Sequence, residues 1–113
     1  MDKKYAAQEA ITHSMMGSLG LKLIEEKEGF IRASMPVNDN TSQPFGVLCG
    51  GASLAFAEII AGYGSYLCCP EGFIPVGSSV SGNHVSSVRK APDVWVYAEA
   101  TALHLGRTTH LWN

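Results

Sequence analysis

The chain has 113 residues, of which 46% are hydrophobic and 16% charged, and its formal net charge is −2. A chain of this length forms one small domain, and a slightly negative charge without a basic cluster argues against a nucleic-acid-binding protein. Its apolar runs are too short to cross a bilayer, it has no secretory signal, and three cysteines make no disulfide framework, so we expect a cytoplasmic protein.

The N-terminal third predicts a helix, a connector and a hairpin. Residues 3–12 have helical composition, and the apolar connector 14–20 contains two glycines. Residues 21–26 and 30–37 read as strands, the second with clear alternation, and the polar turn that ends in Gly29 makes them a hairpin. Residues 38–45 are dense in turn formers and predict an exposed loop.

One long apolar helix is predicted over residues 51–67, with Pro70 ending it. Few polar positions interrupt its faces, so we expect it to be enclosed on most sides. A wide apolar stripe is typical of a helix buried against a sheet, and it contains Ala52, Ala55, Phe56, Ile59, Ile60 and Tyr63.

The remainder has strand character, over residues 73–87, 94–105 and 107–113. The predicted class is therefore α+β, an antiparallel sheet with one long helix inserted after the first hairpin. Such a sheet leaves an edge strand exposed, and pairing between two copies would protect it.

Glu58 is the one formal charge between Asp39 and Glu71. Its helical neighbours are apolar or small, and an ionised carboxylate is costly to bury there unless something pairs with it or uses it. Gly50 and Gly51 precede it and leave free backbone N–H groups at the helix start. These features predict a reaction centre; the alternative is a carboxylate paired with a distant Lys or Arg.

The stretch QPFGVLCGGASLAFAEIIAG closely resembles the substrate loop and central helix of hotdog-fold acyl-CoA thioesterases. The branch it resembles is the phenylacetate-degradation type, which includes the 1,4-dihydroxy-2-naphthoyl-CoA hydrolases of menaquinone synthesis. The likeness extends through SLGLKLIEEKEGFIRASMPVNDNT, GNHVSSVRKAP and LHLGRTTHLW. It implies a hotdog fold, a curved antiparallel sheet wrapped around one central helix. Because the family normally continues with further strands, we expect that the sequence ends short of its natural C-terminus.

The resemblance implies that Glu58 is the catalytic carboxylate, either as nucleophile or as general base on water. Backbone N–H groups at Gly50 and Gly51 would hold the oxyanion, and Gln43 would orient the thioester or the water. His84 matches a histidine at the substrate site, on a strand facing the partner subunit's helix; a solvated strand histidine is the plainer interpretation.

Cys49 departs from the pattern, which has histidine at this position. A thiol is a weak donor and does not copy an imidazole. Cys49 is then either a nucleophile, for which the sequence supplies no base, or a small tolerated substitution that lowers efficiency. We favour the second interpretation.

The resemblance also predicts the substrate contacts. Gly62 stands where relatives often carry Ser or Thr, so the acyl pocket would be wider; Tyr63, Phe56 and Met16 would line it, although a place in the core is more common for such residues. Hydroxyls, backbone N–H groups and arginines suit the phosphate-rich CoA arm. That set comprises Val85, Ser86, Ser87, Arg89, His104, Gly106, Arg107, Thr108 and Thr109.

The resulting hypothesis is an acyl-CoA thioesterase with an aromatic acyl group, sites shared across a dimer, dimers paired into tetramers, and no cofactor. A non-catalytic module that binds acyl-CoA is the second hypothesis. A dehydratase on the same fold is the third, although it would want a histidine near the helix start. The four histidines show no ligand spacing, so we expect no metal site.

Overall fold

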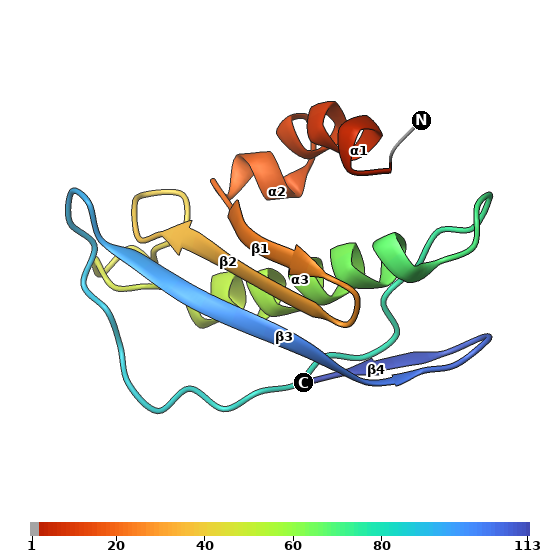
Figure 1. Ribbon diagram of the computed structural model, residues 1–113. Coiled ribbons are helices and arrows are strands. Elements are labelled where there is room, and N and C mark those ends of the chain that lie inside the picture. The colour runs from red at the N-terminus through yellow and green to blue at the C-terminus, as the bar shows by residue number, and fades with distance from the viewer. Residues whose placement is uncertain (1–2) are drawn as a thin grey trace.

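The computed structural model describes residues 3–113, and of residues 3–7 the backbone alone. Its elements are α1 (Lys3–Thr12), α2 (Met15–Ser18), β1 (Lys22–Lys27), β2 (Phe30–Pro36), α3 (Gly50–Cys68), β3 (Trp95–Leu105) and β4 (His110–Trp112). The strands form one antiparallel sheet in the order β1-β2-β3-β4, and α3 lies along one face of it (Figure 1). The predicted α+β class with one long helix is confirmed.

The N-terminal hairpin forms as its sequence predicts. Lys27 pairs with Phe30 across a two-residue turn, and Gly29 in that turn has a φ of 77°, a conformation that favours glycine. The connector before β1 forms the short helix α2, with Ser14 as its N-cap. The predicted helix over residues 3–12 and the strand over 94–105 are present as α1 and β3.

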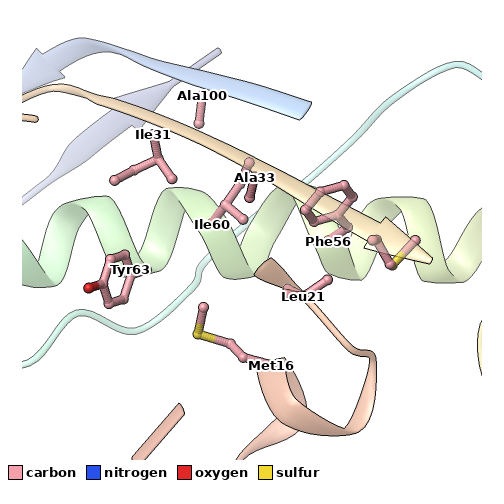
Figure 2. Packing of buried hydrophobic residues seen from close by; sticks show 9 residues of the cluster. Met16, Leu21, Ile31, Ala33, Phe56, Ile60, Tyr63 and Ala100 are labelled. Atoms are coloured by element: carbon pink, nitrogen blue, oxygen red, sulfur yellow. The ribbon is translucent and has the colours of Figure 1, made fainter. Parts of the chain in front are cut away.

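The core lies between α3 and the inner face of the sheet (Figure 2). Phe56, Ile60 and Tyr63 recur every three or four residues and so share one face of α3, as predicted. They pack against the alternate residues of β2, with α2 and Leu21 closing one end. The buried cluster comprises Met16, Leu21, Ile31, Ala33, Met35, Phe56, Ile60, Tyr63 and Ala100. Met16, Phe56 and Tyr63 are therefore core residues and do not line an open pocket.

A close approach at Gly64 sets how near α3 comes to the sheet. A Cβ built there would lie 2.6 Å from Trp112 Cη2 and 3.0 Å from Ile31 Cγ1, closer than side chains normally pack. Next to it, the buried Ser65 Oγ accepts a hydrogen bond of 2.8 Å from Trp112 Nε1 and lies 2.7 Å from His110 Nδ1. The C-terminal part of α3 is thus fixed to β2 and β4 at one point.

One prediction about the segment after α3 is wrong for this single chain. The helix itself is exposed at Gly51, Ala57 and Glu58, and its other residues are buried or half-buried. Residues 73–87 form no strand: within the described part of the chain, no backbone group of residues 74–87 bonds to another backbone group. A strand needs a neighbour at hydrogen-bonding distance, and this segment runs beside α3 and outside the sheet (Figure 1).

We predict that Gly64→Ala destabilises the fold, because the new methyl group has no room between Trp112 and Ile31. The expected loss in the free energy of unfolding is about 1–3 kcal/mol, measured by urea denaturation. Gly62→Ala is the matched control on the same helix. A Cβ there meets nothing within 4 Å, so helix propensity should stabilise the protein by about 0.5–1 kcal/mol. Equal effects of the two substitutions would contradict the close packing at Gly64.

Candidate active site

The start of α3 presents free backbone donors. Cys49 is the N-cap, with an extended backbone and no side-chain capping bond, and its carbonyl accepts from the amides of Ala52 and Ser53. The amides of Gly50 and Gly51 have no backbone acceptor among the described residues. Two unpaired N–H groups at the positive end of a 19-residue helix attract negative charge.

The loop before α3 is held in place by its own hydrogen bonds. The Gln43 amide donates a hydrogen bond of 2.9 Å to the Val47 carbonyl. The amide of Gly46, a residue with a φ of 86°, donates to the Gln43 carbonyl. The loop is also tied to residues 88–90: Leu48 donates to the Val88 carbonyl and Lys90 to the Gly46 carbonyl. These bonds keep Gln43 beside the first turn of the helix.

Asp39 anchors the same region from the other side. Its carboxylate accepts a hydrogen bond of 2.7 Å from Lys90 Nζ. That hydrogen bond, together with the positive charge of Lys90, lowers the pKa of Asp39. The residues that precede Gln43 are thereby connected to the segment that follows Ser87.

A cavity of about 260 Å³ opens at this helix start. The structure brings five of the predicted residues together there, Gln43, Gly50, His84, Ser86 and Ser87. Three further lining residues were not predicted: Val47, Leu48 and Ser53. Ser53 could have been recognised from the sequence by its helical spacing, because a residue three positions after Gly50 lies on the same side of the helix.

His84 covers the helix start of its own chain. A Cβ built on Gly50 would lie 3.1 Å from His84 Cε1, 3.2 Å from Nε2 and 3.3 Å from Nδ1, so the imidazole lies flat against the glycine. The prediction placed His84 on a strand that faces the partner subunit's helix. In this structure it comes from an extended non-strand segment and contacts α3 of the same chain.

Glu58 lies outside the cavity, two turns further along α3. Its side chain is exposed, so the expected burial among apolar neighbours is not found in the single chain. Neither a hydrogen bond nor an ion pair to Glu58 occurs in the described part of the chain, so the alternative of a paired carboxylate is not observed. Its carboxylate occupies the space that a Cβ on Gly77 would fill.

The residues predicted to hold CoA form two separate groups. Ser86 and Ser87 line the cavity, and Val85 and Arg89 adjoin them. His104, Gly106, Arg107, Thr108 and Thr109 lie at the turn between β3 and β4. Pro36 pairs with Trp95 near the helix start, so the turn lies at the opposite end of β3, roughly 33 Å away by the rise of an extended strand. One chain does not bring the two groups together (Figure 1).

A second, larger cavity of about 410 Å³ lies at the far end of α3 and contains none of the predicted residues. Its lining consists of Glu26, Lys27, Glu28, Leu67 and Cys68. In the described residues no three His, Cys, Asp or Glu side chains gather as a metal site would require. No described helix has the length and hydropathy needed to cross a membrane.

Comparison with known families settles what kind of chain this is. The sequence profile of the thioesterase superfamily matches residues 45–113, which include α3, residues 45–49 of the loop before it, and the strands β3 and β4. The chain belongs to the thioesterase superfamily. Its relatives include the 1,4-dihydroxy-2-naphthoyl-CoA hydrolase of Escherichia coli, 36% identical over 99 residues that cover 88% of this chain and 71% of the relative. The resemblance drawn from the sequence is therefore confirmed.

Solved thioesterase structures share the fold. The crystal structure of thioesterase HI1161 from Haemophilus influenzae superposes with a TM-score of 0.82 at 39% identity, covering 92% of this chain and 71% of that one. A mutant of thioesterase PA1618 from Pseudomonas aeruginosa gives a TM-score of 0.84 at 38% identity, covering 96% and 76%. These superpositions confirm the predicted hotdog fold.

We predict that Gly50→Ala displaces the His84 imidazole, because the new methyl group would lie 3.1–3.3 Å from three atoms of the ring. The His84 Cε1–Hε1 signal in a ¹H–¹³C NMR spectrum should therefore shift. Gly51→Ala is the control, since a Cβ there meets Cys49 Sγ at 3.7 Å, an ordinary contact. An unmoved His84 signal in Gly50→Ala would show that the ring does not lie on the helix start.

Proposed function

We propose that the protein hydrolyses an acyl-CoA thioester, with an aromatic acyl group, to the free acid and CoA. One observation carries the proposal: α3 has two unpaired N–H groups at Gly50 and Gly51 and, about 12 Å further along by the helical rise, the unpaired carboxylate of Glu58. Two antiparallel copies of α3 would set the amides of one copy against the carboxylate of the other. Thioester hydrolysis needs both parts, a donor for the developing oxyanion and a base or nucleophile.

In the proposed reaction, the thioester carbonyl oxygen binds the free amides at the start of α3. The Glu58 side chain of a second copy either takes a proton from the attacking water or attacks the carbonyl carbon itself, because the carboxylate of the same copy lies about 12 Å further along the helix. Charge then develops on the oxygen that faces the helix N-terminus, where the N–H groups and the helix dipole stabilise it. The carbon–sulfur bond breaks, CoA leaves as the thiol, and water supplies the second oxygen of the acid.

The cavity residues have supporting roles in this proposal. The Gln43 side chain orients the thioester or the water, and His84 bounds the cavity over Gly50. Cys49 caps the helix through its backbone carbonyl, which any residue type supplies, so we retain the interpretation of a tolerated substitution. Gly62 leaves open space on the same helix, which suits a bulky aryl group.

We further propose that the working form is a homodimer, with dimers pairing into tetramers, in the cytoplasm. The support is the separation of the predicted CoA contacts. Ser86, Ser87 and Arg89 adjoin the cavity, and Arg107 and Thr108 lie at the other end of β3. A second copy in antiparallel orientation would bring its β3–β4 turn to the first copy's helix start and complete the site.

We predict that Glu58→Gln lowers the kcat for acyl-CoA hydrolysis by about 10²–10⁴-fold, since the amide neither takes a proton nor attacks. The measurement is CoA release, followed with a thiol reagent, from a panel of aryl- and fatty-acyl-CoAs that includes 1,4-dihydroxy-2-naphthoyl-CoA. Glu71→Gln, an exposed acid beyond the end of α3, is the control and should keep wild-type rates.

The same panel tests the second candidate, a non-catalytic module that binds acyl-CoA. The observation that favours this candidate is the position of Glu58 outside the cavity in the single chain. Wild-type protein that binds CoA but turns over no thioester would support it and contradict the hydrolase. A hydrolase that Glu58→Gln leaves active would instead contradict the role given to that carboxylate.

A further inference from the structure

Residues 77–84 follow α3 in the opposite direction and contact it three times. A Cβ built on Gly77 would meet Glu58, one on Gly82 would meet Leu54, and one on Gly50 would meet His84. The three helix residues are spaced by four and share one face, which we call the α3 ridge (Gly50, Leu54 and Glu58). Two of the three contacts are made by glycines of the segment.

The contact at Gly77 is with the carboxylate of Glu58. A Cβ built on Gly77 would overlap Glu58 Oε2, and it would lie 3.0 Å from Cδ and 3.6 Å from Cγ. By contrast, a Cβ on Gly82 would meet one atom, the methyl carbon Cδ2 of Leu54, at 3.3 Å. Both groups end flexible side chains and can move aside, but at Gly77 the group that would move is the Glu58 carboxylate itself.

The backbone of Gly77 does not itself require glycine. The glycines with positive φ are Gly20, Gly29, Gly46 and Gly72, so Gly77 adopts a conformation open to other residues. The space occupied by Glu58 is therefore the constraint on this position. The segment is also unpaired in the sheet, so a side chain at 77 breaks no backbone ladder.

Nothing else in the described part of the chain holds the Glu58 carboxylate. It has no hydrogen bond or ion pair there, and the side chain is exposed. An exposed glutamate samples several rotamers, and a contact surface on one side reduces their number. The backbone at Gly77 is such a surface.

We propose that Gly77 is a positioning residue for hydrolysis: its bare backbone is the wall against which the Glu58 carboxylate rests, and any side chain there moves the carboxylate out of line with the thioester. This inference rests on the proposed function. A displacement of about 1 Å in a reacting group costs on the order of 10²-fold in rate. In the proposed dimer, Gly50 and His84 of one copy would lie at the oxyanion, and Glu58 and Gly77 of the other copy would supply and position the carboxylate.

The test compares Gly77→Ala with Gly82→Ala and Glu58→Gln in steady-state hydrolysis of the best acyl-CoA from the panel. We expect Gly77→Ala to lower kcat by tenfold or more, about the scale of a misplaced reacting group, with KM and the melting temperature close to wild type. Gly82→Ala should keep kcat and KM within about twofold, because the Leu54 methyl moves aside. A merely structural role would move the melting temperature or KM, or affect both glycine variants alike.

If Gly77→Ala also destabilises the protein, a double-mutant cycle of Gly77→Ala with Glu58→Asp, measured in kcat, still separates the two explanations. Glu58→Asp shortens the side chain by one carbon, so the two changes should be non-additive in kcat. Additive effects would overturn the inference. If Glu58→Gln abolishes turnover while Gly77→Ala matches wild type, the inference fails and the proposed function stands. If Glu58→Gln is fully active, the proposed role of Glu58 fails first.

Discussion

The packing of α3 on the sheet is the constraint on which the rest of this structure depends. Gly64 lets the helix approach Ile31 and Trp112, and Ser65 bonds to the indole of Trp112. Once Phe56, Ile60 and Tyr63 face the core, the 3.6-residue repeat directs the α3 ridge to the opposite side. The free amides and the carboxylate are therefore placed on one accessible face by the same residues that build the core. Packing and chemistry therefore occupy opposite sides of α3 up to Tyr63, and beyond it the buried Ser65, on the same side as Glu58, is bonded to β4.

Local pattern was enough to predict most of the fold. The hairpin has alternation and a glycine turn, α3 has an apolar stripe, and β3 alternates small and bulky side chains from Trp95 to Leu103. Side chains of residues 73–87 also alternate, but the strand predicted there does not form. Alternation indicates an extended chain with two faces, but it does not say which strand will supply the hydrogen bonds. In this chain residues 77–84 run along α3, and Gly77 and Gly82 allow the close approach.

The site was predicted less completely, because its geometry depends on residues far apart in the chain. Motif likeness placed Gln43, Gly50 and His84 in one site, and the structure joins them around one cavity. The motif likeness did not reveal that Glu58 is exposed or that the predicted CoA contacts lie at opposite ends of β3. Gly77 carried no signal of its own, since a glycine beside serines in an extended segment suggests flexibility. Its importance follows from what it touches.

The most direct test of the account is a crystal structure of the Glu58→Gln variant with an intact acyl-CoA. The thioester carbonyl oxygen should lie about 2.7–3.1 Å from the amide nitrogen of Gly50 or Gly51, with residue 58 of the second copy facing the carbonyl carbon. A thioester bound elsewhere, for example in the cavity between Glu28 and Cys68, would contradict it.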